Sequence, residues 1–387
     1  MITSESSTAP QPSAHVPKLM KAAVLREPGG ELTIEEIRTP APARGEVLVK
    51  VAACGVCHTD LHVMKGEVRF PMPGVLGHEV SGIVAALGDG IPDRLGLAIG
   101  SRVVGAFIMP CGECEACAQG RDDLCHQFFD LNRLRGVLYD GSSRLFTKDG
   151  SELAMYSMGG LAEYAVIPVT GVSLLPEKLP LQDSAVLGCA ALTAYGAVRR
   201  AADVRLGETV AVVATGGVGS NIVQIARASG AAQVIAIDVD PTKLKAAAAL
   251  GATHTIDAAH TDAVEAVRAL TDGRGVDVAF EVLGKPATFR QAADMLRDGG
   301  RLVAVGIADG AATADIEITR LVRRSQRIIG SYGARTRTDL RQVVSLAAAD
   351  VLRPHQTVTR TFTLDDASKA YGALSRGEIT GRAVVVM

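Results

Sequence analysis

The sequence predicts an α/β chain built from two folded units, one rich in short strands and one containing a doubly wound parallel sheet. From Lys21 to Gly105, short apolar segments are separated by turn signals such as Pro28-Gly29-Gly30. From Thr209 onward, continuous apolar strands alternate with segments of helical period, as in a parallel sheet covered by helices on both faces. A chain of 387 residues, 48% of them hydrophobic, is also longer than one core usually serves.

Composition narrows the class of protein. The formal net charge is -2, so we expect neither nucleic acid nor an anionic membrane as a partner. No apolar run is long enough to span a bilayer. Residues 1–19 are rich in Ser, Pro and Ala and lack the apolar region of a secretory signal, so we expect a disordered tail on a cytoplasmic protein. Seven cysteines, four of them within 111–125, indicate metal binding in a reducing compartment rather than disulfides.

The densest group of reactive side chains lies in 56–62 and is followed by Gly77-His78-Glu79. Together the two pieces hold a thiol, a hydroxyl, two carboxylates and three imidazoles, from Cys57, Thr59, Asp60, Glu79, His58, His62 and His78. Thiolates and neutral imidazoles are ligands that zinc prefers, and a hydroxyl near an imidazole suits a proton relay. The alternative, a strand end with a buried cysteine and surface histidines, explains any one of these residues but not the set. We therefore expect a zinc site here.

Two other cysteines have a simpler interpretation. Cys54 precedes Cys57 with the spacing of a redox pair, but no βαβ unit surrounds it and it ends an apolar strand. Cys189 lies in the Ala-rich segment 183–200, whose period predicts a helix. On the residues alone, both are small core hydrophobes.

A second metal site is indicated by Cys111, Cys114, Cys117 and Cys125. Four thiolates at this spacing are the ligand set of a closed structural zinc site. An iron–sulfur cluster is the main alternative, but its bacterial motif continues with three residues and Cys-Pro, whereas seven residues and then Cys125-His126 follow here. The stretch 128–160 that comes next is long and contains several glycines, and we expect a loop that is functional or mobile.

A dinucleotide-binding turn is predicted at 214–219. The strand 209–214 leads into Gly216, Gly217, Val218 and Gly219, which open a helix, and the second strand, 233–238, ends in Asp238. Ala214 stands where the first glycine of this motif is usual. A carboxylate at Asp238 would accept ribose hydroxyls and repel a ribose phosphate, which favours NAD over NADP. A glycine-rich turn in an unrelated α/β sheet is the alternative, but it does not explain strand, helix, second strand and Asp together.

These features in this order resemble the zinc-dependent alcohol dehydrogenases of the medium-chain dehydrogenase/reductase superfamily, over about residues 20–387. The resemblance implies a GroES-like catalytic domain formed by 20–190 and 332–387, with a structural zinc lobe at 107–126. It implies a Rossmann NAD-binding domain at 191–331. Two zinc ions per chain are then expected, one catalytic and one structural.

The resemblance also implies roles for individual residues. Cys57, His78 and Cys189 would hold the catalytic zinc, so Cys189 becomes a ligand. Glu79 would be a carboxylate near the metal that ligates it transiently, and Asp60 would orient a ligand. Thr59 and His62 would form the proton relay, and Phe107 would line the substrate pocket. Coenzyme contacts would come from His58, Lys243 and Arg382 in addition to the glycine turn and Asp238.

The implied activity is NAD-dependent interconversion of an alcohol and an aldehyde or ketone, in a homodimer or homotetramer. Two alternatives within the superfamily remain open: reduction of activated C=C bonds, and oxidation of a glutathione adduct of formaldehyde. A third alternative is a scaffold protein without catalytic activity, which should have lost ligands or relay residues, and the sequence retains all of them.

Overall fold

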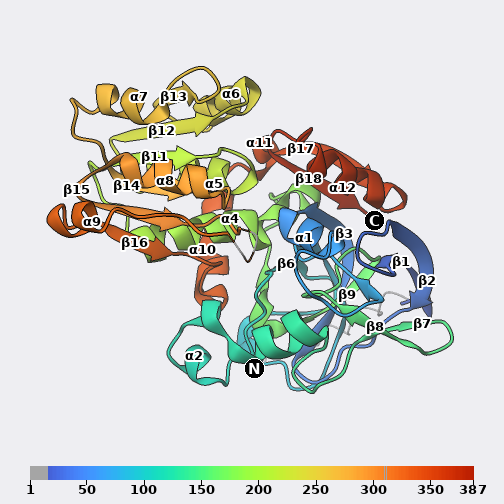
Figure 1. The fold of residues 1–387 in the computed structure, drawn as a ribbon. Coiled ribbons are helices and arrows are strands. Elements are labelled where there is room, and N and C mark those ends of the chain that lie inside the picture. Colours follow the sequence, from blue (N-terminus) through green and yellow to red (C-terminus); the bar gives the residue numbers. More distant parts are fainter. Residues whose placement is uncertain (1–15, 309, 311) are drawn as a thin grey trace, which may run out of the picture.

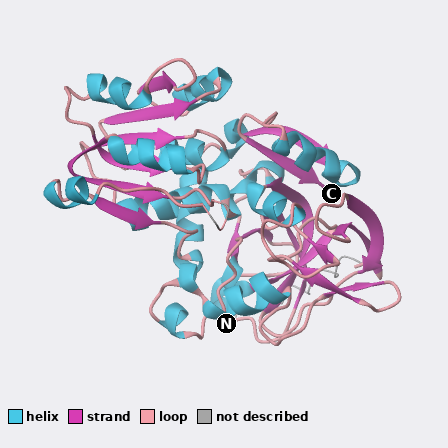
Figure 2. Ribbon diagram, in the orientation of Figure 1, coloured by secondary structure: helices cyan, strands magenta, loops and turns pink. Residues whose placement is uncertain are grey.

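The computed structural model describes residues 16–308, 310 and 312–387, arranged around three sheets (Figure 1). The predicted tail, 1–19, therefore lies mostly outside the described residues, although the first strand begins at Leu19. Figure 2 shows the parallel sheet flanked by helices on one side of the molecule and the strand-rich part on the other. No helix in the described ranges combines the length and apolar character needed to cross a bilayer.

The strand-rich part contains a small closed barrel and a larger, mostly antiparallel sheet. The barrel order is β1-β2-β7-β8-β4. Its strands are β1 (Leu19–Leu25), β2 (Leu32–Arg38), β7 (Leu145–Thr147), β8 (Glu152–Met155) and β4 (Gly74–Val75). The second sheet has the order β10-β6-β5-β3-β18-β17, with β9 also paired to β3. Its strands are β10 (Val172–Leu174), β6 (Arg102–Gly105), β5 (Val80–Leu87), β3 (Glu46–Val56), β18 (Arg382–Val386), β17 (Val358–Thr363) and β9 (Tyr164–Pro168).

The third sheet confirms the predicted doubly wound α/β architecture. Its order is β13-β12-β11-β14-β15-β16, and all neighbouring pairs are parallel. The strands are β11 (Thr209–Val213), β12 (Gln233–Asp238), β13 (His254–Asp257), β14 (Val276–Glu281), β15 (Leu296–Ala304) and β16 (Arg327–Gly330). The helices linking the first four are α5 (Gly217–Ala228), α6 (Pro241–Ala249) and α7 (Ala263–Leu270), followed by α8 (Pro286–Asp294) and α9 (Ile318–Arg323).

The remaining helices lie between or around these sheets. They are α1 (His58–Met64), α2 (Glu115–Ala118), α3 (Leu181–Ser184), α4 (Ala190–Tyr195), α10 (Thr336–Ala348), α11 (Pro354–Thr357) and α12 (Ala367–Ser375). In Figure 1, α4 and α10 occupy the middle of the molecule, where the parallel sheet meets the strand-rich part. Strand β18 returns to pair with β3, with Ala383 opposite Val56, so the end of the described chain completes the sheet that carries Cys57.

Two local predictions are wrong. The stretch 128–160 is not an open loop, because it holds a π-helical segment at Phe128–Arg133 and the barrel strands β7 and β8. Its apolar side chains, such as Phe128 and Leu153, are buried, but short strands separated by glycine turns leave no readable period. The segment 183–200 is not one helix either: it breaks at Cys189, whose backbone torsions are φ -136° and ψ -69°.

Candidate active site

Four side chains that are far apart in the sequence converge at the end of β3. Ligand atoms of Cys57, His78, Glu79 and Cys189 all lie within 4.8 Å of one another, and all four residues are buried. Cys57 follows β3 and precedes α1, and His78 and Glu79 lead into β5. Cys189 reaches them through the helix break, where Gly188 packs so closely that a Cβ would lie 1.9 Å from the Gly105 carbonyl oxygen. The structure therefore brings together the three predicted zinc ligands and the nearby carboxylate.

His78 is oriented by a buried carboxylate. Its Nδ1 lies 3.0 Å from Asp60 Oδ1, which also accepts a hydrogen bond from the Gly77 amide at 3.1 Å. The Tyr371 hydroxyl donates to the other oxygen, Asp60 Oδ2, at 2.8 Å. With Nδ1 as the donor, Nε2 is left as a free acceptor, and among the described residues this buried nitrogen has no hydrogen-bond partner. Such a nitrogen beside two buried thiols fits a zinc ion.

Glu79 is linked to Arg382 rather than to the thiols. Arg382 Nη2 lies 3.1 Å from Glu79 Oε1, a charge contact without hydrogen-bond alignment, since neither carboxylate oxygen has a hydrogen-bond partner in the described structure. Burial raises the pKa of Glu79 to about 7, and the Arg382 guanidinium opposes that rise. Gly55 makes room for the carboxylate, because a Cβ there would lie 2.2 Å from Glu79 Oε2.

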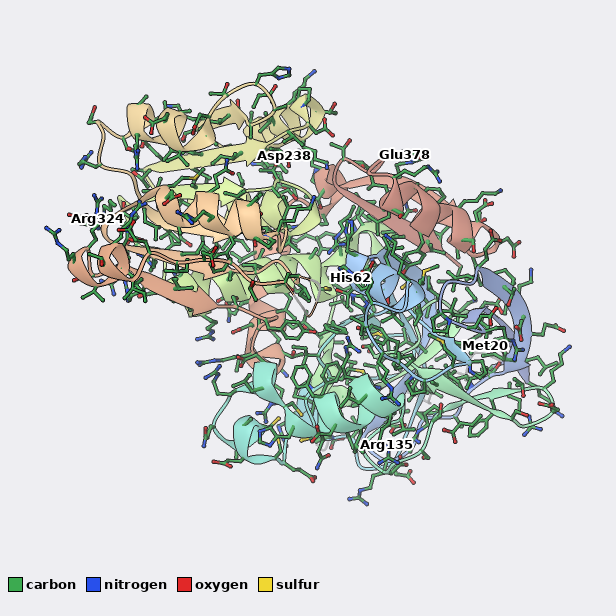
Figure 3. The ribbon with its side chains drawn as sticks, viewed as in Figure 1. Met20, His62, Arg135, Asp238, Arg324 and Glu378 are labelled. Carbon is green, nitrogen blue, oxygen red and sulfur yellow. The ribbon has the colours of Figure 1, made fainter. Side chains whose placement is uncertain are left out.

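The predicted proton relay runs along one face of α1. Thr59 Oγ1 lies 3.5 Å from Cys57 Sγ. One turn later, the His62 side chain is 30% exposed, near the middle of the molecule in Figure 3. Its Nδ1 forms an ion-pair contact with Glu67. This partner was not predicted, although Glu67 lies only five residues from His62 in the sequence. The Thr59 hydroxyl beside Cys57 and the partly exposed His62 imidazole are thus on the same short helix, α1.

The glycine turn lies beside the same group. A Cβ at Gly219 would lie 2.0 Å from the Ala214 carbonyl oxygen, and one at Gly217 would lie 2.4 Å from Arg382 Nε. Ala214 itself has a φ of +74°, a left-handed conformation in which glycine is usual. Gly216 is the N-cap of α5, so the Gly217–Gly219 amides open a helix of twelve residues.

The residues predicted to contact the coenzyme differ in burial and in hydrogen bonding: Asp238 is buried and bound by backbone amides, whereas His58 and Lys243 are more exposed. Asp238 Oδ2 accepts from the Thr215 amide at 2.8 Å, and Oδ1 accepts from the Val239 and Asp240 amides at 2.8 and 3.1 Å. The carboxylate therefore fastens the glycine turn to the end of β12. His58 is exposed and Lys243 partly so, and neither forms a hydrogen bond or ion pair with another described side chain.

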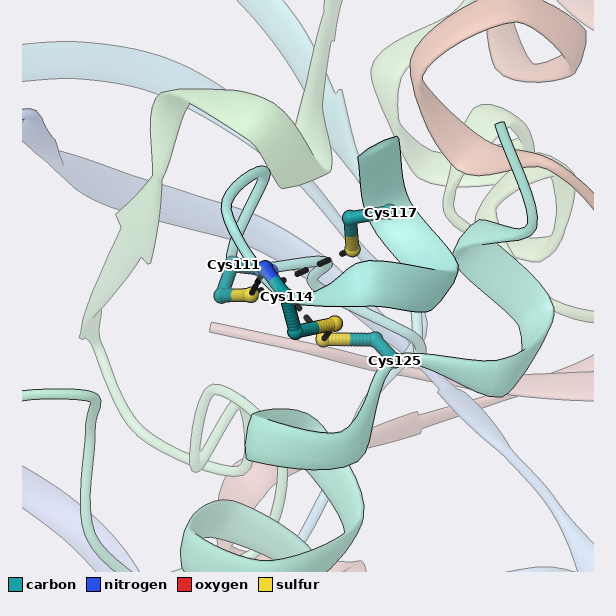
Figure 4. A group of neighbouring side chains, drawn as sticks. All are labelled: Cys111, Cys114, Cys117 and Cys125. Carbon is teal, nitrogen blue, oxygen red and sulfur yellow. Dashed lines mark hydrogen bonds between the residues drawn. The ribbon is translucent and has the colours of Figure 1, made fainter. Parts of the chain in front are cut away.

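The four-cysteine lobe forms a compact cluster of thiols (Figure 4). Cys111 Sγ lies 3.9 Å from Cys117 Sγ, and Cys114 Sγ lies 4.0 Å from Cys125 Sγ. Zinc with four bonds of about 2.3 Å requires sulfur–sulfur distances of about 3.8 Å, so the cluster fits a tetrahedral ion. The lobe is tied to α10 by Arg337, whose Nε donates to buried Asp122 at 2.9 Å.

Aromatic rings line one side of the group formed by Cys57, His78, Glu79 and Cys189. The predicted pocket residue Phe107 lies with its ring centroid 4.6 Å from that of His78. Tyr156 lies 6.0 Å from His78, and Tyr332 lies 6.3 Å from Phe107. Burial raises the pKa of Tyr332 to about 12, against the opposing effect of the Arg133 guanidinium. Tyr156, Tyr332 and Arg133 were not predicted, because they come from segments without a recognisable motif.

Comparisons with known proteins agree with this architecture. Residues 43–177 match the alcohol dehydrogenase GroES-like domain, and residues 217–349 match the zinc-binding dehydrogenase domain. A Mycobacterium tuberculosis (strain H37Rv) protein assigned as alcohol dehydrogenase D is 34% identical over 92% of this chain and 97% of its own. The S-(hydroxymethyl)glutathione dehydrogenase of Synechocystis sp. is 33% identical over 92% of this chain and 97% of its own.

Solved structures are similarly close. The alcohol dehydrogenase zinc-binding domain protein from Burkholderia ambifaria superimposes with a TM-score of 0.90 and 34% identity, over 95% of this chain and 99% of that chain. Benzyl alcohol dehydrogenase from Acinetobacter calcoaceticus gives 0.89 and 29%, over 96% of this chain and 100% of that one. The chain thus belongs to the zinc-dependent alcohol dehydrogenases of the medium-chain dehydrogenase/reductase superfamily, and is an oxidoreductase with zinc and a nicotinamide coenzyme as its cofactors.

Proposed function

We propose that this protein interconverts an alcohol and an aldehyde or ketone with NAD, using one catalytic and one structural zinc per chain. The observation that carries the proposal is the buried His78 Nε2, which has no hydrogen-bond partner in the described part of the chain and lies within 4.8 Å of the Cys57 and Cys189 thiols. Three protein ligands leave a position open for substrate, whereas four thiolates close a structural site. Zinc held by Cys57, His78 and Cys189 would supply a Lewis acid for an alcohol hydroxyl, and a bound nicotinamide would supply the hydride acceptor.

The chain's own residues hold the ligands and conduct the proton. Asp60 fixes the His78 ring through the 3.0 Å contact to Nδ1, so that Nε2 points at the metal position. The Thr59 hydroxyl, next to Cys57, is placed to receive the substrate proton. His62 is partly exposed and exchanges that proton with solvent, and Glu67 holds its ring in place.

We favour NAD over NADP because of Asp238. Its charge at the end of β12 lies where a ribose phosphate would be repelled, although its oxygens already accept amides of the chain. Against this stands a zinc-binding dehydrogenase from Sinorhizobium meliloti that is 28% identical and was solved bound to NADP. Measuring kcat/KM with NAD and with NADP tests the proposal. Asp238→Ala should lower the ratio of kcat/KM for NAD to that for NADP. A wild type that prefers NADP would refute this assignment.

A second candidate is oxidation of a glutathione adduct of formaldehyde. It is favoured by the 33% identity to S-(hydroxymethyl)glutathione dehydrogenases from Synechocystis sp. and Schizosaccharomyces pombe. Formaldehyde with and without glutathione distinguishes this activity from simple alcohol oxidation. Reduction of activated C=C bonds, the remaining alternative, is tested by following NADPH consumption with enones.

The decisive experiment combines metal analysis with an activity panel. Purified protein is analysed for zinc and iron, and then assayed with NAD and primary, secondary and aromatic alcohols. The proposal predicts two zinc ions per chain and alcohol-dependent NADH formation. One zinc per chain without activity on any alcohol would contradict it.

Domain division, assembly and compartment are also proposals. The separate sheets support a catalytic domain of 20–190 and 332–387 and a nucleotide domain of 191–331.

The edge of the parallel sheet supports an assembly. Strand β16 ends this sheet, and near it the apolar side chains of Ile318 and Val322 are 75% and 69% exposed, which supports a homodimer or homotetramer formed at this edge. Light scattering of the purified protein tests that assembly. None of the seven cysteines, all of which the structure describes, forms a disulfide, which supports a cytoplasmic location.

A further inference from the structure

Arg133 is a cation in the aromatic wall of the candidate active site. It ends the π-helical segment Phe128–Arg133, its side chain is half-buried, and its guanidinium carbon lies 4.9 Å from the centre of the Tyr156 ring. No Asp or Glu of the described chain forms an ion pair with it. Buried arginines elsewhere in the molecule do have such partners: Arg301 pairs with Glu208 at 2.7 Å, and Arg382 with Glu79 at 3.1 Å.

The unpaired guanidinium is close to the group that would hold the metal. Tyr156, which it covers, lies with its ring centre 6.0 Å from that of His78 and 5.9 Å from that of Phe107. Arg133 also acts on Tyr332, whose ring centre lies 6.3 Å from that of Phe107. Its guanidinium opposes the burial-driven rise in the pKa of the Tyr332 hydroxyl, through its charge and a side-chain hydrogen bond. One aromatic ring therefore separates the cation from a proposed zinc ligand.

The wall around Arg133 is aromatic, and its polar groups are two tyrosine hydroxyls, those of Tyr156 and Tyr332. Phe107, Phe128 and Phe129 pack edge to face in sequence, and Phe129 contacts Tyr332. The Tyr156 hydroxyl is buried without a hydrogen-bond partner in the described structure. A partly desolvated cation in such surroundings is costly unless an anion neutralises it. Because no carboxylate among the described residues pairs with the half-buried guanidinium, a bound anion would find its counter-charge here.

We propose that the substrate carries a carboxylate that Arg133 binds, with its alcohol or carbonyl group at the other end, about one aromatic ring away, at the metal. This inference rests on the proposed function, and it names the substrate class of the same site. The planar guanidinium fork matches a carboxylate with two parallel hydrogen bonds, and its low hydration suits an aromatic setting. Arg133 is then a residue that determines specificity.

The test uses matched pairs of substrates that differ in charge but little in shape. 4-(Hydroxymethyl)benzoate is compared with 4-(hydroxymethyl)benzamide, and 6-hydroxyhexanoate with 6-hydroxyhexanamide, so that a rigid and a flexible spacer are both sampled. The zinc-loaded enzyme is assayed with NAD, and kcat/KM is measured for each. A charge-assisted contact predicts that the carboxylate is preferred over its amide by about tenfold to a hundredfold in at least one pair.

Variants of Arg133 assign that preference to the guanidinium. Arg133→Met should remove the preference for the carboxylate. It should lower kcat/KM for the carboxylate, while kcat/KM for the amide changes less than about threefold. Arg133→Lys should retain part of it, because the charge remains without the planar fork. The matched control is Arg135→Met, which removes an exposed guanidinium at the outer edge of the molecule (Figure 3) and should change neither substrate.

A binding measurement gives a readout that does not depend on turnover. Benzoate and benzamide are titrated calorimetrically into the zinc-loaded, NAD-saturated enzyme and its Arg133→Met variant. Tighter benzoate binding that disappears in the variant supports the proposal. Equal rates for both members of both pairs, or an Arg133→Met variant that leaves benzoate binding unchanged, would overturn it. If no alcohol is oxidised at all by the zinc-loaded protein, it is the proposed function that fails.

Discussion

The Arg382 guanidinium lies between the Glu79 carboxylate, 3.1 Å away, and the backbone of Gly217 in the coenzyme turn. One buried side chain thus contacts both the proposed metal group and the proposed pyrophosphate site. We expect Arg382→Met to weaken NAD binding by about tenfold or more, because it removes a charge from the phosphate position. Fluorescence titration with NAD measures this effect. Arg360→Met on the neighbouring β17 is the control, since Arg360 is 42% exposed and contacts Glu378 and the Phe362 ring, away from the ligand group.

Removing a proposed ligand should empty the catalytic site and leave the lobe loaded. Cys57→Ser is expected to lower the zinc content from two ions to one and to reduce turnover by on the order of a thousandfold or more, because the Lewis acid is lost. NAD binding should persist, since the glycine turn is untouched. Cys54→Ala is the control, as this buried thiol lies outside the group of ligands. Full activity in Cys57→Ser would contradict the zinc mechanism.

The relay can be separated from the metal by its pH dependence. His62→Gln should slow alcohol oxidation mainly at low pH, because the imidazole is needed to pass the proton to solvent when hydroxide is scarce. Stopped-flow rates between about pH 6 and pH 10 measure this. His260→Gln provides the comparison, because His260 is also paired with a carboxylate but is 82% exposed and far from the site in sequence. An unchanged profile in His62→Gln would remove His62 from the relay.

The contact between the four-cysteine lobe and α10 should contribute to stability without affecting chemistry. Asp122→Asn is expected to lower the free energy of unfolding by about 1–3 kcal/mol, because the partly exposed Arg337 guanidinium loses its charged and buried acceptor. Denaturant unfolding with both zinc sites loaded measures this difference. Asp123→Asn, one residue away and paired with its neighbour Arg121, should have an effect below about 0.5 kcal/mol. Equal effects of the two variants would show that the link to α10 carries no stability.

The strain at Ala214 leads to a stabilising substitution. At a φ of +74°, the methyl group is unfavourable by about 1–2 kcal/mol, and part of that is recovered when glycine replaces it. Ala214→Gly should therefore raise the free energy of unfolding by about 0.5–1 kcal/mol. Ala228→Gly, at an exposed position at the end of α5, should lower it by about 1 kcal/mol. The opposite signs make the pair a direct test, and a destabilising Ala214→Gly would refute the strain argument.

Local patterns were sufficient to predict the parts of the protein whose residues are neighbours in the sequence. The glycine turn, the four thiols and the Cys57–His62 stretch are of this kind, and the predicted parallel sheet is confirmed. Cys189 was different: its segment reads as a helix, and only the close approach of Gly188 to Gly105 explains the break that directs its thiol to Cys57. Tyr371, which lies 311 residues from its partner Asp60, has no local signal at all.

The substrate side was the least predictable. Arg133 and Tyr156 come from a stretch interpreted as a loop, since its strands are only three and four residues long and show no alternation. Their meaning depends on which rings lie beside His78, and packing of that kind is set by the tertiary fold rather than by spacing in the chain.

The pairing of β18 with β3 has a consequence for biosynthesis. Cys57 and His78 emerge from the ribosome long before Tyr371 and Arg382. Until they arrive, Asp60 and Glu79 lack the partners that orient and neutralise them. We expect a nascent chain to fold its nucleotide-binding sheet while metal is still held only loosely at the future active site. Catalytic competence should therefore appear in one late step, after β18 has docked on β3.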